Sequence, residues 1–392
     1  MKYRGMRDER TDRRAVLMAM AATALGSSAT TAMAAETGVT DKSIKVGQSA
    51  VFTGPAKDFG VDYKAGISLY FDRTNKAGGV FERKLELVSL DDAYEPKKTA
   101  ENTARLIDEE KVFALIGYVA TGNLIAAMPL AEKAGVPMFA PLVGTTSFRT
   151  THNRYLFHVR ASYETELRKI VGHLATLGIT NIAVAYQNSA FGKSNLETCL
   201  QIAQGLKVKV VESVPLEIAA TDAKAQVAQL TKAQPGAVVM IMAGKMVEVF
   251  LRDYRAGGGA APLYTISVGI TDAPGSAQRL NGGIEGLVTA SIVPSPQASR
   301  LPIVVDYRKD RTDAGAKIDS YTMLEGYIAA RVFVEGLRRA GRNLTREAFI
   351  KAMEDMGTTK FGDFPVQYGP NNHNGSNFVD LEMYTRTGSL RR

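Results

Sequence analysis

Short apolar runs rich in β-branched residues alternate with helical patterns along most of this chain, and this alternation limits the possible folds most strongly. The first series predicts strands over 44–52, 85–90, 112–117 and 136–140, with helices over 59–76, 96–108 and 123–134 between them. A β-α-β order of this kind predicts a parallel sheet covered by helices on both faces.

The same alternation then repeats. Strands are predicted over 181–186, 207–214, 237–242 and 263–267, with helices over 164–177, 193–204, 221–233 and 247–256, the third beginning at a capping Thr221; a strand-like segment follows over 286–293. The last part is predicted to hold helices over 318–339 and 345–356 and strands over 364–368 and 381–385. Two α/β units without a Pro/Ser-rich linker predict two lobes joined by several short crossings.

The first 34 residues have the three parts of a secretory signal peptide. Six basic and three acidic residues occupy positions 2–14, an apolar stretch follows over 15–25, and Ala32-Met33-Ala34 is a cleavage motif. An amphipathic helix would need polar residues at helical spacing over 15–25, and these are nearly absent. We therefore expect a signal peptide over 1–34 and a mature protein in the periplasm that begins at Ala35 or Glu36. Arg13-Arg14 matches a twin-arginine signal only in part, so the export route stays open, and the lack of a cysteine at the cleavage point excludes a lipid anchor there.

Composition excludes several other classes of protein. The net charge of +8 over 392 residues comes partly from the N-terminal segment, and the remaining positive charge is scattered, so we expect no nucleic-acid partner. The single Cys199 rules out an internal disulfide and Cys-rich zinc sites. No apolar run reaches the roughly 20 residues that a membrane-spanning helix needs.

Motifs for enzyme chemistry are missing. Gly244-Lys245-Met246 lacks the upstream glycine and the Ser/Thr of a phosphate loop, and the glycines at 257–259 end a helix instead of opening one. G-x-S-x-G and H-E-x-x-H do not occur. Asp91-Asp92 closes a strand before Pro96, where aspartate is typical of turns and caps. We therefore predict that the protein is not an enzyme and needs no cofactor.

The four histidines also lack the spacing of a metal site. They are His152, His158, His173 and His373. Each is interpreted as a surface or structural residue, and no metal site is predicted.

An ordered set of short motifs resembles the leucine/isoleucine/valine-binding family, the periplasmic solute-binding proteins of ABC importers. The set is Ile44-Lys45-Val46-Gly47, Thr53-Gly54-Pro55, Phe59-Gly60, Asn75-Lys76-Ala77-Gly78-Gly79-Val80, Asp91-Asp92 with Pro96, Ile116-Gly117, Ala134-Gly135-Val136-Pro137, Phe191-Gly192 and Tyr254-Arg255-Ala256-Gly257. It covers essentially the whole mature chain in the family's order.

The resemblance implies an α/β, two-lobed type I periplasmic binding fold, in which each lobe is a mostly parallel sheet flanked by helices. Lobe 1 would hold 42–158 and 288–360, and lobe 2 would hold 159–287 and 361–392. Three hinge crossovers would fall near 158–160, near Thr289 and near 361–362. Open α/β sheets bind ligands beyond the carboxyl ends of their strands, so the ligand site is expected in the cleft between the lobes.

The loop at 118–122 is the first candidate for ligand binding. It follows a predicted strand and precedes a helix, so free backbone N–H groups and the helix dipole favour a carboxylate there. The resemblance implies that the Thr121 hydroxyl contacts this carboxylate. Alternatively, Thr121 caps the helix, and it can do both.

Further candidates come from the other strand ends. The resemblance implies a second ligand loop at 141–146, where Gly144 replaces the usual threonine and its contact passes to Thr145 or to the backbone. Phe59 and Phe191 would close over the ligand; the alternative is that both are core aromatics. The full predicted set of ligand residues is Phe59, Tyr118, Val119, Ala120, Thr121, Leu142, Gly144, Thr145, Phe191, Gly244 and Val268.

Two positions depart from the family pattern. Tyr94 and the pair Val119-Ala120 stand where the family has paired cysteines, so that disulfide is lost. Val268 stands where the family usually has the glutamate that holds the ligand's α-ammonium group.

The resemblance implies a monomeric binding protein that captures a small carboxylate-bearing ligand, an amino acid or a related organic or aromatic acid, and delivers it to ABC permease subunits. A ligand-sensing receptor domain with a signalling partner is the alternative. A hydrolase on a similar scaffold is disfavoured by the missing nucleophile motifs.

Overall fold

The computed structural model describes Met1 and residues 36–391 of the chain. Apart from Met1, the signal peptide predicted over 1–34 lies outside the described residues. Among these residues, no helix has the length and apolar character that would let it cross a membrane.

The first sheet has five parallel strands in the order β2-β1-β3-β4-β5. The strands are β1 (Ser43–Ala50), β2 (Lys84–Asp91), β3 (Ala114–Ile116), β4 (Met138–Phe139) and β5 (Leu156–Phe157), and the helices between them are α2 (Lys57–Lys76), α3 (Pro96–Asp108), α4 (Thr121–Lys133) and α5 (Ser147–Thr150). The first four strands and three of these helices confirm the predicted order. The very short β5 and α5 were not predicted.

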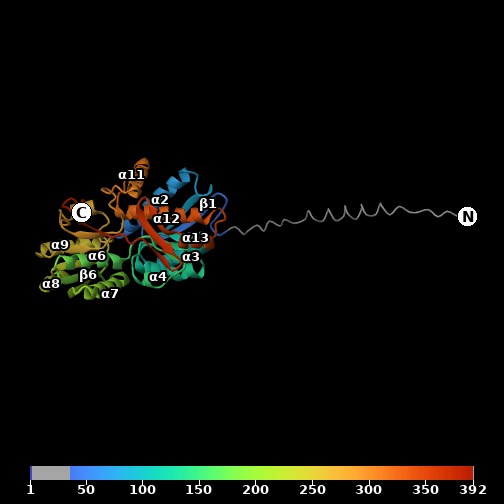
Figure 1. The fold of residues 1–392 in the computed structure, drawn as a ribbon. Coiled ribbons are helices and arrows are strands. Elements are labelled where there is room, and N and C mark those ends of the chain that lie inside the picture. The colour runs from blue at the N-terminus through green and yellow to red at the C-terminus, as the bar shows by residue number, and fades with distance from the viewer. Residues whose placement is uncertain (2–35, 392) are drawn as a thin grey trace. The chain divides into compact units, whose positions relative to one another are not determined.

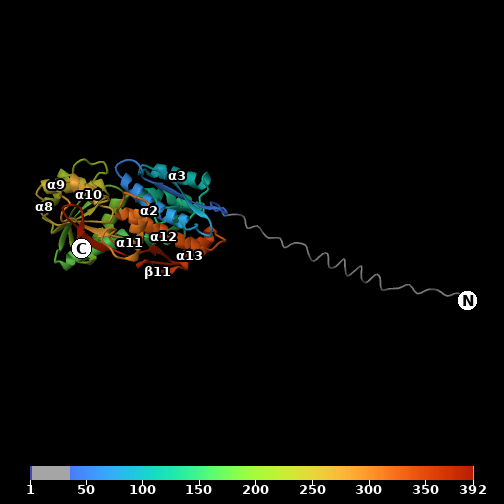
Figure 2. The ribbon, with the colours of Figure 1, turned by 90° about the horizontal axis from the view of Figure 1, so that it is seen from above.

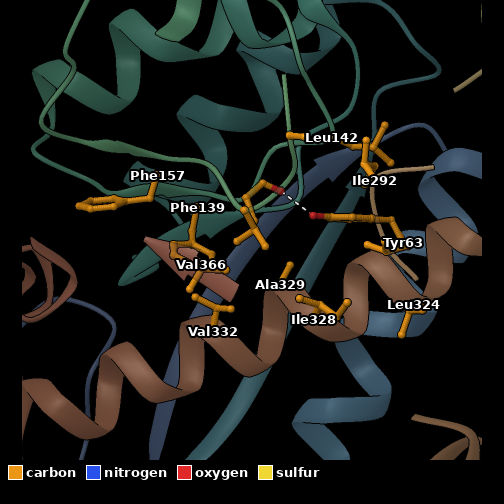
Figure 3. Close-up of a cluster of buried hydrophobic side chains, with 14 of the residues drawn as sticks. Tyr63, Phe139, Leu142, Phe157, Ile292, Leu324, Ile328, Ala329, Val332 and Val366 are labelled. Atoms are coloured by element: carbon orange, nitrogen blue, oxygen red, sulfur yellow. Dashed lines mark hydrogen bonds between the residues drawn. The ribbon is translucent and has the colours of Figure 1, made fainter. Parts of the chain in front are cut away.

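Helices cover both faces of this sheet. Helices α3 and α4 pack on one face through Leu106, Leu124 and Met128. On the other face, α2 and the long α12 (Tyr321–Ala340) share one core with the strands. Figure 3 shows Ile328 and Val332 of α12 on the Phe139 side of this core.

Two glycines allow α2 and α12 to touch backbone to backbone. A Cβ atom on Gly66 would lie 1.9 Å from the carbonyl oxygen of Met323, and one on Gly326 would lie 2.3 Å from the carbonyl oxygen of Tyr63. The Tyr63 hydroxyl, drawn in Figure 3, donates a hydrogen bond of 2.8 Å to the Ala140 carbonyl at the end of β4. The helix pair is thereby fixed to the strand end where the second predicted ligand loop begins.

The second sheet has seven strands in the order β15-β14-β10-β9-β8-β6-β7. Its strands are β6 (Asn181–Gln187), β7 (Lys209–Leu216), β8 (Ala237–Ile241), β9 (Leu263–Thr265), β10 (Val288–Ser291), β14 (Asp380–Tyr384) and β15 (Leu390–Arg391), and its helices are α6 (Tyr163–Thr176), α7 (Ala190–Gly205), α8 (Lys224–Lys232), α9 (Lys245–Ala256) and α10 (Ala273–Arg279). The strands from β6 to β10 are parallel, and the last two are antiparallel. Figure 1 shows the helices α6 to α9 around this sheet.

The start of α8 differs from the expectation. Thr221 was predicted to cap this helix, but the N-cap residue is Ala223, and its side chain makes no capping hydrogen bond. The Ala223 N–H donates instead to the Asp253 carboxylate at 2.6 Å. This bond ties the residue before α8 to α9, and the first N–H groups of α8 have no side-chain cap.

The rest of the chain returns to the first sheet. Helices α11 (Pro302–Asp313) and α13 (Arg346–Glu354) precede an antiparallel three-stranded sheet of β11 (Gly357–Phe361), β12 (Phe364–Gly369) and β13 (Asn372–Gly375). Figures 1 and 2 show α11 beside α12. The ring centroids of Tyr307 in α11 and Tyr327 in α12 are 5.5 Å apart. The chain passes between the two large sheets three times, after β5, after β10 and before β14.

Two segments lie elsewhere than the predicted lobe ranges place them. Strand β10 was assigned to lobe 1, but it pairs with β9 and β14 in the second sheet. The segment 361–375 was assigned to lobe 2, but Tyr368 packs on Phe157 of β5, and its hydroxyl donates to the His158 carbonyl at 2.6 Å. The second and third crossings therefore come later in the chain than expected, because strand pairing continues to Ser291 and the β12–β13 hairpin packs on β5. The remaining lobe boundaries stay a prediction.

Candidate ligand-binding site

A cavity lies where helix starts and strand ends from both sheets meet. About 290 Å³ of space is not filled by atoms, and the walls are Phe59, Tyr94, Val119, Ala120, Thr121, Leu142, Tyr163, Phe191, Ala243 and Val268. The loops after β3 and β4 contribute from the first sheet, and those after β8 and β9 contribute from the second. This is the edge of the sheets at which open α/β proteins hold ligands.

The start of α4 forms one wall and is built to accept an anion. The first N–H groups of a helix have no partner within the helix. The N-cap residue Ala120 has φ +80° and makes no side-chain capping bond to them. Because Ala120 and Thr121 both line the cavity, a carboxylate there would meet unpaired N–H groups and the positive end of the helix dipole.

Thr121 is the first helical residue and not the cap. Its Oγ1 lies 2.7 Å from Thr145 Oγ1, and both side chains are buried. Thr145 therefore stands behind Thr121 and fixes the orientation of its hydroxyl.

The start of α9 faces the same cavity from the second sheet. Gly244 is its N-cap residue, with φ +59° and no side-chain capping bond, and the preceding Ala243 lines the wall. A Cβ atom on Gly244 would lie 3.4 Å from Cε2 of Phe59. Phe59 of α2 thus reaches across to the loop before α9, and it also belongs to the buried core.

The structure brings seven of the eleven predicted ligand residues to the cavity wall. They are Phe59, Val119, Ala120, Thr121, Leu142, Phe191 and Val268. Thr145 lies directly behind the wall, and Gly244 lies beside it.

The placement of Tyr118 in the site is wrong. Its ring is fully buried in the core beneath α3 and α4, and its hydroxyl lies 3.0 Å from Thr103 Oγ1. Successive side chains of an extended segment point to opposite faces. Because Val119 points into the cavity, Tyr118 points away from it.

Gly144 explains one lining residue that the sequence did not reveal. A Cβ atom on Gly144 would lie 2.9 Å from the Tyr163 backbone nitrogen and 3.0 Å from its ring. Tyr163 fills the space of the missing side chain, lines the cavity and packs edge-on against Phe191 at 5.2 Å. The replacement of the family's threonine by Gly144 was the only sequence feature that could have indicated this. It leaves space that the ring of Tyr163 fills.

Tyr94 was also missed as a wall residue. The sequence showed it only as the replacement of a cysteine, yet its side chain lines the cavity. Burial raises the pKa of Tyr94, so the phenol stays neutral. Four aromatic rings therefore surround a cavity whose described wall residues include no charged side chain.

A cluster of buried charged side chains lies outside the described wall of this cavity, and several of its polar atoms have no hydrogen-bond partner. Arg160, in the first crossing, donates from Nη2 to Ser267 Oγ at 2.5 Å and lies 3.5 Å from Glu166 Oε1. The Ser267 N–H donates to Glu166 Oε2 at 2.7 Å. Val268 lines the aromatic cavity next to Ser267, and Glu166 is not among the residues of that wall.

A second cavity, with about 390 Å³ of unfilled space, shares Leu142 and Val268 with the first. Glu325 of α12 lines it, with Oε1 3.6 Å from Arg160 Nη1. Burial raises the pKa of Glu325, and Arg160 opposes this shift. Glu325 Oε1 is buried without a hydrogen-bond partner beside this second cavity, whereas Glu166 accepts from Ser267.

Comparison with known proteins settles the family. A family model described as periplasmic binding protein matches residues 43–381 of the chain. The chain belongs to this family. The prediction of the leucine/isoleucine/valine-binding family is thereby confirmed, as is the type I fold. Members are substrate-binding proteins, which confirms that the protein is not an enzyme.

Individual relatives agree with this assignment. The leucine-, isoleucine-, valine-, threonine-, and alanine-binding protein of Pseudomonas aeruginosa is 24% identical over 330 residues, 82% of this chain and 83% of that protein. An amino acid binding protein of the same organism is 32% identical over 108 residues, and this match spans only 28% of each chain. A substrate-binding periplasmic protein from Ralstonia solanacearum aligns with a TM-score of 0.81 at 29% identity, over 88% of this chain and 99% of that structure.

Proposed function

We propose that this periplasmic binding protein captures a small carboxylate-bearing ligand with an apolar or aromatic body and delivers it to the membrane subunits of an ABC importer. The observation that carries the proposal is the uncapped start of α4, which opens into a cavity walled by aromatic rings. The ten wall residues are mostly apolar and aromatic with few polar groups, as is typical of small-molecule pockets.

The described walls of the aromatic cavity offer no charged acceptor for the ammonium group of an α-amino acid. A buried ammonium group without an acceptor is penalised by at least about 1–3 kcal/mol, and more for a charge. This corresponds to roughly ten- to hundredfold weaker binding. Phe59 and Phe191 could offset part of this by cation–π contact, worth roughly 0.5–2 kcal/mol. Tyr118 cannot contribute, because its ring lies in the core.

Calorimetry with leucine and its 2-oxo analogue tests this ligand class, because the two differ only in the α-substituent. We expect the oxo acid, and small aromatic acids such as benzoate, to bind at least as tightly as leucine. Tight binding of leucine without binding of the oxo acid would show that an acceptor for the ammonium group exists and would overturn the proposal.

Delivery to a permease and residence in the periplasm require tests in cells. We expect uptake of the calorimetric ligand to fall when the gene is deleted and to return with the wild-type protein. The protein recovered from the periplasm should begin at Ala35 or Glu36, which mass spectrometry of the intact chain would measure. Uptake that is unaffected by the deletion, or an intact Met1, would contradict these expectations.

A further inference from the structure

Three residues that are far apart in the sequence form a compact cluster away from the ligand cavity. His152 follows α5, Glu354 ends α13, and His373 lies in β13. Their potential ligand atoms all lie within 4.8 Å of one another. The His373 Nε2 atom is 3.5 Å from Glu354 Oε1, and the two imidazole ring centres are 4.6 Å apart.

His373 is held in a fixed orientation. Its side chain is only 5% exposed, and its ring stacks on Phe157 at 3.8 Å between centroids. Its Nδ1 lies 3.1 Å from the Asn153 carbonyl and 3.2 Å from the Leu156 carbonyl. Carbonyl oxygens only accept hydrogen bonds, so Nδ1 carries the proton, and the lone pair of the neutral ring is on Nε2.

The Nε2 atom of His373 has no hydrogen-bond partner, although it is buried. A buried lone pair therefore points toward a carboxylate and a second imidazole. Metal-binding histidines commonly have this arrangement, in which the other ring N–H donates to a backbone carbonyl.

The spacing suits a tetrahedral metal ion. Zinc lies about 2.0–2.1 Å from histidine nitrogen and about 2.0–2.2 Å from carboxylate oxygen, which places two ligand atoms of a tetrahedron about 3.3–3.5 Å apart. The observed 3.5 Å between His373 and Glu354 agrees with this value. His152 is exposed and can turn its ring toward the same point, and water would complete the coordination.

The geometry points to a divalent metal site of the zinc type formed by His152, Glu354 and His373. A bound ion would tie β13 and α13 to the loop before β5. The backbone N–H of His158, in the first crossing, donates to the His373 carbonyl at 2.8 Å. The ion would thus reinforce the first lobe next to the segment on which the lobes hinge.

Zinc titration of tag-free, chelator-treated protein tests the site. We expect saturable binding of one equivalent by calorimetry and a higher unfolding temperature that EDTA reverses. His152→Ala and Glu354→Gln should weaken zinc binding by at least about tenfold. His173→Ala removes an exposed histidine of α6 outside the cluster and should bind zinc like the wild type.

Cobalt provides a second readout that does not depend on stability. Co²⁺ in a tetrahedral site absorbs visible light strongly, so this band should appear with the wild type and be lost in His152→Ala. The exposed position of His152 lets that variant fold, which calorimetry with the transport ligand would verify. The inference is overturned if wild-type protein shows no one-equivalent zinc binding, or if His152→Ala and Glu354→Gln bind zinc as tightly as the wild type.

Discussion

The Thr121 hydroxyl is the one side-chain polar group that the described cavity wall offers at the start of α4. We expect Thr121→Val to weaken carboxylate binding by about ten- to hundredfold, because a hydrogen bond to a charged group contributes about 1.5–3 kcal/mol. Thr145→Val is the matched control, since it breaks the same Thr121–Thr145 hydrogen bond from behind the wall. Calorimetry that gives equal losses for both variants would assign Thr121 a structural role only.

Substitutions of Val268 test the proposal that the cavity disfavours an ammonium group because its wall lacks a charged acceptor. Val268→Glu places an acceptor in the wall, so we expect it to shift the ratio of leucine to 2-oxo-acid affinity toward leucine by at least about tenfold. Val268→Gln has a similar size without charge and should leave the oxo acid preferred. The two ratios are measured by calorimetry with both ligands, and equal ratios for the two variants would contradict the electrostatic explanation.

At the level of elements, the contact between α2 and α12 depends on Gly66. We expect Gly66→Ala to destabilise the protein by about 1–3 kcal/mol or more, because its Cβ atom would lie 1.9 Å from the Met323 carbonyl oxygen. Gly172 in α6 has open space around its Cα, so Gly172→Ala should stabilise by about 0.5–1 kcal/mol. Urea unfolding measures both changes, and a stable Gly66→Ala protein would show that the helices can separate.

The same helix pair predicts a pH effect. Burial raises the pKa of Asp62 in α2 from 3.8 to about 6; the hydrogen bond from Ser320 opposes this shift, and Asp58 and Asp272 add smaller increases. The folded state then binds this proton more tightly than the unfolded state, so the stability due to Asp62 is highest below pH 3.8 and declines as the pH rises to about 6. Relative to Asp62→Asn, wild-type protein should lose unfolding free energy across this window. Parallel pH curves in urea unfolding would contradict it.

Elements with a local signal could be predicted, and contacts between distant segments could not. Pro96 and the helical pattern after it located α3 to the residue, and the Gly78-Gly79 pair marked the end of α2. The two-residue β5 was missed, although β4 of the same length was predicted within the apolar run 136–140. His152 and His373 lie on separate segments that meet only when β13 docks on β5, so their spacing gave no metal signal. Tyr163 lines the cavity because Gly144 leaves space for its ring, and this contact is visible only in the tertiary structure.

At the scale of the whole molecule, the three crossings predict closure around the ligand. Arg160, in the first crossing, lies 3.5 Å from Glu166 of α6 and 3.6 Å from Glu325 of α12, so this ion cluster lies at the predicted hinge. We expect a smaller radius of gyration by small-angle scattering when the ligand saturates the protein. An unchanged radius at saturation would argue against hinge closure, and a variant that does not bind, such as Thr121→Val at low ligand concentration, should keep the unliganded value.

The buried position of Cys199 in α7 has a practical consequence. This only cysteine of the chain is inaccessible, and burial raises the pKa of its thiol to about 12, so it resists alkylation at neutral pH. A thiol introduced on the surface would therefore be the one group that a maleimide dye modifies. Lys193 is exposed two residues beyond Phe191. A dye attached at Lys193→Cys would report on the cavity mouth and turn the protein into an optical sensor for its own ligand, without removal of the natural cysteine.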